Sequence, residues 1–378
     1  MCSTAVDGAK PVSEEPSVWC FLGDRTGDNN QALALAEALG WPFEVKRLDY
    51  TILRKVPNRI VSSGFFPLTR SARSTVAPPY PDLIIGVGQR GVPVARAIRT
   101  ASGGRTRTVV IGWPRCSPAV LDLVVTTANY PVPSHSNVLK LPIAMSRRRP
   151  VADGGRDPRW AALRRKYPGP WWGFLVGGPS RHWDLTPELV ERALVRLTAL
   201  AAEEGATLAV VTSRRSSASL RDAIARVLEE TGTPDLFFAP DDPDRAAYQR
   251  ILGTVSRLAV TGDSVAMLSD AVASGAEVAL VLPEARPAGR WRVAASRAWT
   301  RMGGLGWERD LEAFWAEATD AGLVGSMEDP VNVGAPDVAA LAAAWVKSRL
   351  ALTAEHCVFA GAGALSSERS HPAAPVPR

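Results

Sequence analysis

Short apolar runs of strand length, alternating with helical segments, are the feature of this sequence that most limits its fold. Apart from Asp122, the runs are apolar or glycine at consecutive positions, which is typical of strands buried on both faces of a parallel sheet that helices cover. The runs are residues 18–22, 83–87, 109–112 and 121–125 in the first half and residues 173–176, 208–211, 258–260 and 278–282 in the second. The predicted helices include residues 31–39, 94–99, 187–203 and 265–274. The fold class is therefore α/β.

One break interrupts this alternation and divides the chain. Residues 146–170 contain three consecutive arginines (147–149), a Gly-Gly pair and several prolines, which is typical of a linker. A length of 378 residues suits two domains. We predict two Rossmann-like, doubly wound domains that face a cleft. The predicted segments are a flexible leader at 1–16, domains at 17–150 and 151–335, a helix at 336–355 and a disordered tail at 356–378.

Charge is unevenly distributed along the chain. Residues 1–150 carry 19 basic and 10 acidic side chains, whereas the rest carry 25 and 28. Between Lys46 and Arg115 there are 13 basic residues and two acidic ones. This suggests that the first half faces something anionic, although on charge alone a solvated surface is the favoured explanation. Nucleic acid is excluded as a partner because this half lacks aromatic residues interleaved along a strand.

Residues 47–73 mix apolar side chains with arginine and lysine. This pattern favours docking to the anionic inner leaflet of a membrane, and a helix packed on the sheet is the alternative.

Cysteine and histidine spacing predicts neither a disulfide framework nor a metal centre. The four cysteines form no C-x-x-C pair, and the four histidines are scattered. The chain has no signal-peptide pattern and no apolar run of about 18 residues. We therefore expect a cytoplasmic protein without a cofactor, whose membrane contact, if any, is peripheral.

Glycine-rich turns follow the predicted strands, and ligands of open α/β sheets bind at such turns. In the first half, the turn after residue 22 leads directly into a helix, and Asp28 lies at that junction. Asp28 is either the N-cap of the helix or a general base facing the cleft. The other predicted contacts on this side are Gly23, Asp24, Thr26, Gly27, Asn29, Gln31, Gly88, Gln89 and Arg90.

The turns of the second half offer backbone N–H groups and guanidinium groups, which suit phosphate oxygens. Helix caps and a solvated helix start are the structural alternatives. The residues predicted to bind a ligand on this side are Gly177, Gly178, Ser180, Arg181, Ser213, Arg214, Arg215, Gly262, Asp263, Ser264, Met267 and Asp270. The sequence lacks the P-loop, G-x-G-x-x-G and G-x-S-x-G motifs, which argues against NTPase, dehydrogenase and hydrolase chemistry.

These turns, in this order, resemble the "mitochondrial fission, elongated mitochondria" family. The matching stretches are residues 21–31, 39–40, 81–88, 137–138, 177–180, 212–215 and 261–267. The same loops resemble those of GT-B glycosyltransferases that act on lipid-linked acceptors. That resemblance implies an acceptor-side first domain with Asp28 as the base, and a second domain that binds a nucleotide sugar. It also implies that Asp270 contacts the nucleotide ribose and that no metal is needed.

The resemblance leaves three functions open. The first is an inverting glycosyltransferase that transfers a sugar to an anionic or lipid-linked glycan acceptor. The second is a non-catalytic family member that acts through protein or membrane partners, and the third is a nucleotide-sugar epimerase. The stretch around His135 lacks the His-Asp pair that the family often has upstream of Asn137, which is compatible with an altered acceptor or with lost activity.

Overall fold

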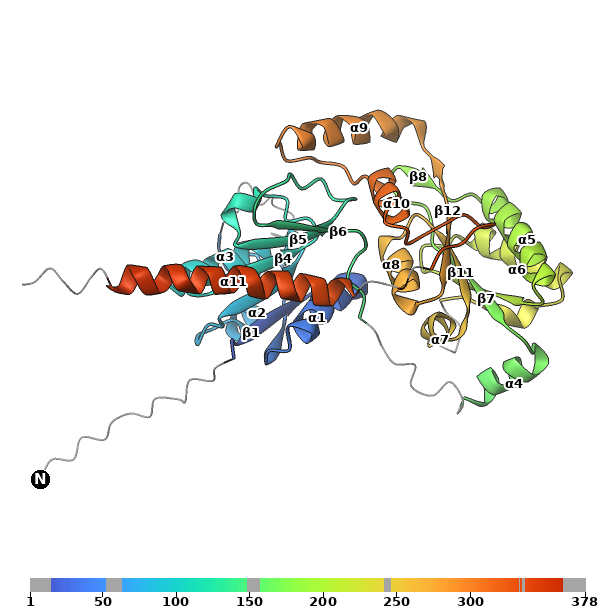
Figure 1. The fold of residues 1–378 in the computed structure, drawn as a ribbon, viewed down its shortest axis with the longest axis horizontal. Coiled ribbons are helices and arrows are strands. Elements are labelled where there is room, and N and C mark those ends of the chain that lie inside the picture. Colours follow the sequence, from blue (N-terminus) through green and yellow to red (C-terminus); the bar gives the residue numbers. More distant parts are fainter. Residues whose placement is uncertain are drawn as a thin grey trace, which may run out of the picture.

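The structure, a computed structural model, describes residues 15–51, 63–147, 157–240, 246–332, 334 and 337–362, with the side chains of Ala288 and 351–362 left out. It contains two parallel sheets that lie side by side, each with helices packed against it (Figure 1). Across the described segments, no helix has the length and apolarity needed to cross a membrane.

The first sheet has six parallel strands in the order β2-β1-β3-β4-β5-β6. Chain order reverses between β1 and β3, which pair in parallel from Val18 and Leu83. The reversal makes their carboxyl ends the switch point, where ligands of such sheets bind. The strands are β1 (Val18–Leu22), β2 (Phe43–Arg47), β3 (Leu83–Val87), β4 (Arg107–Ile111), β5 (Leu123–Thr127) and β6 (Val138–Leu141).

Strand β1 is buried on both faces, as its continuous apolar sequence predicts. Val18, Cys20 and Leu22 belong to the core cluster that includes residues of α1 (Thr26–Leu39), whereas Trp19 and Phe21 belong to the cluster on the other face, with residues of α2 (Arg70–Thr75) and α3 (Val92–Ala101). Side chains alternate between the faces of a strand, so a strand covered on both sides must be apolar throughout.

The second sheet has five parallel strands in the order β10-β9-β7-β11-β12, and its switch point lies between β7 and β11. The strands are β7 (Trp171–Val176), β9 (Thr207–Thr212), β10 (Phe237–Phe238), β11 (Arg257–Thr261) and β12 (Glu277–Val281). The accompanying helices are α4 (Pro158–Lys166), α5 (Pro187–Glu203), α6 (Ala218–Glu230), α7 (Ala247–Thr254) and α8 (Val265–Ser274). The predicted fold class, α/β with two Rossmann-like domains, is confirmed.

The last helix, α11 (Val338–Ala362), follows the second domain but packs on α1 of the first. Figure 1 shows it lying along the first domain. It includes residues 356–362, which were predicted to belong to a disordered tail, so that part of the prediction is wrong. The helix continues because residues 338–360 contain neither glycine nor proline to end it. The leader at 1–14 and the tail at 363–378 lie outside the described residues.

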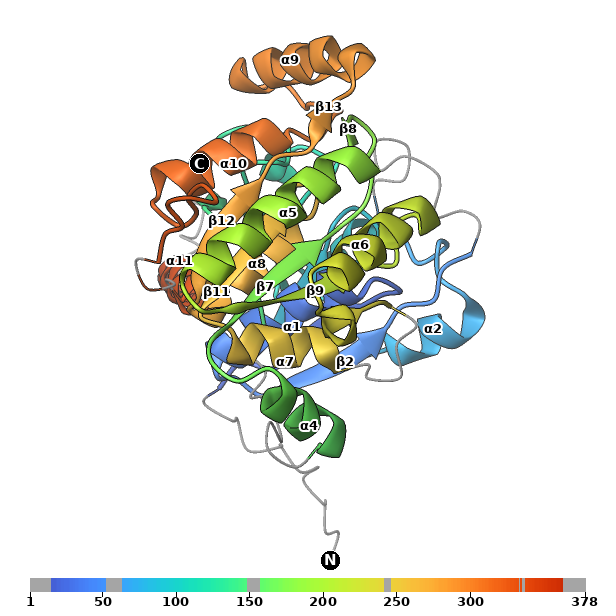
Figure 2. The same cartoon turned by 90° about the vertical axis from the view of Figure 1, so that its right-hand side faces the viewer.

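Two helices after β12 were not predicted. They are α9 (Pro287–Arg301) and α10 (Leu311–Asp320), and a short antiparallel pair of strands, β8 (Trp183–Asp184) and β13 (Glu284–Ala285), precedes α9. Figure 2 shows α9 standing away from both sheets.

Candidate functional site

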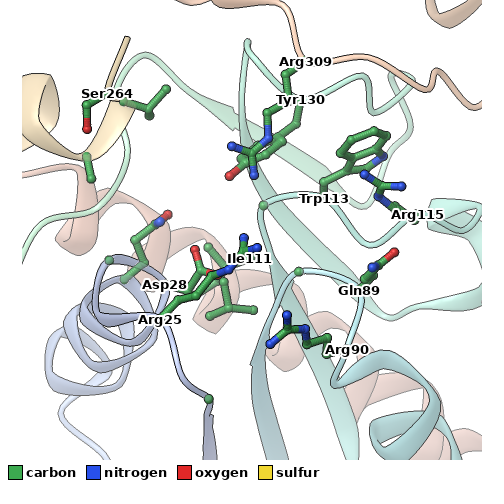
Figure 3. Close-up of a pocket in the computed structure, with 18 of the residues that line it drawn as sticks. Arg25, Asp28, Gln89, Arg90, Ile111, Trp113, Arg115, Tyr130, Ser264 and Arg309 are labelled. Carbon is green, nitrogen blue, oxygen red and sulfur yellow. The ribbon is translucent and has the colours of Figure 1, made fainter. Parts of the chain in front are cut away.

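A cavity of about 640 Å³ lies between the domains, at the switch points of both sheets. Its volume is in the usual range for small-molecule sites. Loops after β1, β3 and β4 line it from the first domain, and loops after β7, β9 and β11 line it from the second. Figure 3 shows Asp28, Arg90, Trp113 and Arg309 around this space.

Asp28 does not cap α1, so that interpretation is wrong. The N-cap position is Arg25, whose side chain makes no cap hydrogen bond, and Asp28 is the third residue of the helix. Asn29 closes the preceding turn instead, because its Oδ1 accepts from the Gly23 N–H and its Nδ2 donates to the Gly23 carbonyl, each at 2.9 Å. The turn therefore holds its shape without Asp28, whose carboxylate faces the cavity.

Burial raises the pKa of Asp28 above its ordinary value, while the nearby Arg25, Arg309 and Arg90 partly oppose the rise. Across the described segments, no hydrogen bond or ion pair within 4 Å engages its side chain. A raised pKa makes a carboxylate a stronger base, which favours its use as a general base.

The first two turns of the first domain are joined by an ion pair. Arg90 Nη1 donates to Asp24 Oδ1 at 2.6 Å, so the loop after β3 is tied to the loop after β1. Tyr50 also lines this side, and burial raises the pKa of its hydroxyl.

Three arginines supply positive charge to the cavity without an acidic partner among the residues described. They are Arg25, Arg115 and Arg309. The Arg115 guanidinium stacks over Trp113 at 4.0 Å, and that of Arg309 lies over Tyr130 at 5.0 Å. Burial and the neighbouring Arg309 lower the pKa of Arg115. Aromatic faces hold these guanidinium groups while leaving their N–H donors available to an anion.

In the second domain, Asp263 ties three turns together. Its carboxylate, fully buried, accepts from the Gly178 N–H at 3.0 Å, from Thr261 Oγ1 at 2.7 Å and from Arg215 Nη2 at 2.6 Å. Arg215 also donates to the Gly178 carbonyl at 3.1 Å. Asp263 therefore organises the turns rather than offering a free carboxylate to a ligand.

Helix α8 begins at this cavity. Ser264 is its N-cap and accepts from the Met267 N–H, and Val265 and Ala266 line the cavity. A Cβ on Gly27, at the start of α1, would come within 3.7 Å of Ala266. The N-termini of α1 and α8 thus face each other across the domain boundary, and both direct partial positive charge there.

The sequence of this chain matches the family model for mitochondrial fission ELM1 over residues 26–349. The match covers most of the chain and begins at the first residue of α1. The chain belongs to the mitochondrial fission ELM1 family. No curated protein matches the sequence.

Several solved structures are similar to this ELM1-family chain in backbone only. The UDP-GlcNAc 2-epimerase of Neisseria meningitidis bound to UDP-GlcNAc has 12% identity and a TM-score of 0.45, over 88% of this chain and 99% of its own. The MnaA–UDP structure of S. aureus has 11% identity and a TM-score of 0.45, over 86% and 94%. The ADP-heptose heptosyltransferase II of E. coli has 11% identity and a TM-score of 0.40, over 70% and 84%.

Most residues predicted on the first-domain side of this ELM1-family site line the cavity, and Thr26 does not. The lining residues are Gly23, Asp24, Gly27, Asp28, Asn29, Gln31, Gly88, Gln89 and Arg90. On the second-domain side, Ser180, Arg181, Arg215, Asp263 and Ser264 line it. The structure does not bring Gly177, Gly178, Ser213, Arg214, Gly262, Met267 or Asp270 to its surface.

Sequence reasoning missed the residues that complete the cavity from distant segments. These are Trp113, Arg115, Tyr130, Trp307, Glu308 and Arg309. Glu308 is buried, accepts from Arg292 and contacts His182 Nε2 at 2.9 Å. The sequence around Glu308 contains no known motif. The run Trp-Glu-Arg-Asp at 307–310 is the one feature that could have suggested a functional site.

The segment 47–73 divides in the structure. Tyr50 lines the cavity, Leu68 is buried and Phe66 is partly exposed. Residues 52–62 lie outside the described part, so the predicted membrane contact of this segment stays a prediction.

Asp270 anchors the two domains to each other instead of facing the cavity. It accepts from Tyr248 OH at 2.8 Å and from Ser146 Oγ, and the neighbouring Ser269 Oγ accepts from the Ala144 N–H at 2.9 Å. The predicted ribose contact is therefore not supported by its position.

We expect Asp270→Ala to lower the free energy of unfolding by about 1–2 kcal/mol, because two buried donors lose their acceptor. Nucleotide affinity should stay at its wild-type value. Thermal unfolding and calorimetric titration of the same preparation measure both. Weaker nucleotide binding with unchanged stability would restore the ribose contact.

Proposed function

We propose that this protein binds a nucleotide sugar in the interdomain cavity and transfers the sugar to an acceptor hydroxyl. The observation that carries the proposal is the position of Asp28, whose carboxylate faces the cavity. The N-termini of α1 and α8 direct positive charge into the same cavity, as do Arg25, Arg115 and Arg309, which form no ion pair within 4 Å among the described residues. Such a cavity suits a diphosphate and, beside it, a deprotonation.

In the proposed reaction, the hydroxyl oxygen of the acceptor attacks the anomeric carbon of the sugar, and Asp28 accepts the proton of that hydroxyl. The bond from that carbon to the diphosphate breaks, and the nucleoside diphosphate leaves with the bonding electrons. The N-terminus of α8 with Arg115 and Arg309 stabilises the charge on the leaving group. A single base on one side of the sugar favours inversion. Because these charges come from the chain itself, we propose that the reaction needs no metal.

The first test is a thermal-shift screen of nucleotide sugars with the purified full chain, since a ligand that binds only the folded state raises its apparent stability. For the sugar that binds, the double variant Arg115→Ala/Arg309→Ala is expected to weaken affinity about 10- to 100-fold, because two charge-assisted contacts are lost. Isothermal titration calorimetry measures the change. Arg70→Ala, which removes an exposed arginine on α2, is the matched control.

The outcomes separate the three functions. Nucleotide release that depends on an acceptor and persists in a chelator supports transfer. Isomerised nucleotide sugar formed without an acceptor would instead indicate an epimerase. If no nucleotide sugar bound, or if the double variant bound as tightly as Arg70→Ala, the proposal would be wrong and a non-catalytic role would be favoured.

A further inference from the structure

Helix α9 is held on one side and bare on the other. Figures 1 and 2 show it apart from both sheets, joined to the body by its two ends. On its inner side, Ser296 Oγ accepts from the N–H groups of Trp307 and Glu308, and Arg292 donates to Glu308. These contacts fix the rotation of the helix, so its outer face is set by the structure.

The outer face is apolar. Relative to Trp291, its residues recur at i+4, i+7, i+8 and i+11, which places them on one side of a helix. Trp291 is 66% exposed, Trp299 49% and Met302 74%. The full set is Trp291, Ala295, Ala298, Trp299 and Met302. Three large apolar side chains on one exposed helix face indicate an interaction surface for a protein or a membrane.

Cations flank this face. Five arginines and no acidic residue occur between positions 285 and 307. Arg286, Arg292 and Arg297 pair with carboxylates of the body. Arg290 and Arg301 are exposed and have no acidic partner in the described part of the chain. The uncompensated charge therefore lies on the flank of the apolar face, next to Trp291 and Met302 in the sequence.

We propose that α9 (Pro287–Arg301) and Met302 dock in the plane of an anionic lipid bilayer. Tryptophan prefers the boundary between headgroups and acyl chains, and arginine beside it pairs with anionic headgroups. A protein partner would use the apolar face, but it has no need of the flanking cations. The combination favours a membrane surface, at a place distinct from segment 47–73.

If α9 docks on a membrane, the acceptor in the proposed reaction would be carried on a lipid. The segment directly after α9 supplies Trp307, Glu308 and Arg309 to the cavity, so a helix docked on a bilayer is joined directly to the cavity wall. An acceptor carried on a lipid could then enter from the membrane without leaving it. The inference about the acceptor rests on the proposed function, whereas the docking itself does not.

Vesicle flotation of the full chain tests the docking. We expect binding to phosphatidylcholine vesicles containing 30% phosphatidylglycerol and much weaker binding to pure phosphatidylcholine. Trp291→Gln/Met302→Gln should weaken the partition coefficient about tenfold or more, since two large apolar side chains no longer enter the bilayer. Arg290→Gln/Arg301→Gln should weaken it about tenfold and reduce its salt dependence.

The matched control is Val195→Gln/Leu341→Gln, which removes apolar side chains that are 53% and 52% exposed on α5 and α11. This variant should float like the wild type. The docking is refuted if wild-type protein does not float with anionic vesicles, or if the Trp291/Met302 variant floats as well as the control. It is also refuted if light scattering shows a vesicle-free dimer that the variant dissociates, because α9 would then contact a second copy.

The same variants separate this inference from the proposed function. Calorimetry with the nucleotide sugar should give wild-type affinity for the Trp291/Met302 variant. Vesicle binding without nucleotide binding would leave the docking standing and remove the acceptor argument.

Discussion

Replacement of Asp28 by asparagine is expected to lower kcat for sugar transfer by about 10²- to 10⁴-fold, the usual cost of losing a positioned general base. Asparagine keeps the shape of the side chain but accepts no proton from an attacking hydroxyl. Nucleotide affinity should be unchanged or tighter, because a negative charge is removed beside Arg25 and Arg309. Product formation at saturating donor and calorimetric titration measure the two quantities.

The control for Asp28→Asn is Glu37→Gln on the same helix. Glu37 pairs with Arg147 and does not line the cavity, so its loss should leave transfer at the wild-type rate. Equal rates for Asp28→Asn and Glu37→Gln would remove Asp28 from the reaction. Both variants should unfold near the wild-type temperature, since the Gly23–Asn29 hydrogen bonds, not Asp28, hold the turn.

The same base sets the pH profile of kcat/KM. Asp28 works only when ionised, so the rate falls as the pH falls through its pKa. Because burial raises that pKa, the acidic limb lies at higher pH than an ordinary aspartate would give. Asp28→Asn should lose this limb.

Sequence patterns predicted those helices and strands whose burial shows in their own stretch of sequence. Strands β1 and β11 are buried on both faces, so each reads as a continuous apolar run. The edge strand β2 was missed because four of its five residues are exposed, so Phe43 and Val45 alternate with charged residues and form no continuous apolar run. Helix α9 was missed for a related reason, since the arginines around it pair with carboxylates outside the helix: Arg297 with Asp310, and the N-cap Arg286 with the distant Asp184.

The candidate site was predicted in part, and the missing part has a physical cause. Turns after strands carry glycine and capping residues, so Gly23 and Ser264 could be found from sequence. Arg115 and Arg309 reach the cavity through tertiary packing: Arg115 has a positive φ of 52°, and the Asp310 N–H donates to the Asn129 carbonyl of the other domain. No local pattern encodes such contacts.

Asp270 was predicted to bind a ligand but does not line the cavity. Its place on α8, two turns after a glycine-rich strand end, matches a ligand-binding pattern. The carboxylate is instead engaged by Tyr248 and by Ser146, which belongs to the segment that leaves the first domain. Only the position of that segment decides between the two roles.

Replacement of Gly178 by alanine is expected to lower the free energy of unfolding of the second domain by about 3 kcal/mol. A Cβ there would overlap the backbone carbonyl group of Arg215, which cannot swing aside as a flexible side chain would. Separation of these turns would also break the hydrogen bonds from Gly178 N–H to Asp263 and from Arg215 to the Gly178 carbonyl. The melting temperature should fall by roughly 6–12 °C, and nucleotide affinity should fall with it.

Gly23→Ala is the matched control, because a Cβ on Gly23 meets nothing within 4 Å and the residue does not have a positive φ. Its stability should stay within about 0.5 kcal/mol of the wild type. Differential scanning calorimetry compares the two variants. If both melted at the wild-type temperature, the three turns would tolerate separation, and Asp263 would lose the organising role inferred from its hydrogen bonds. If only Gly178→Ala were destabilised, and the loss were smaller in an Asp263→Asn background, the coupling between turn packing and the buried carboxylate would be measured directly.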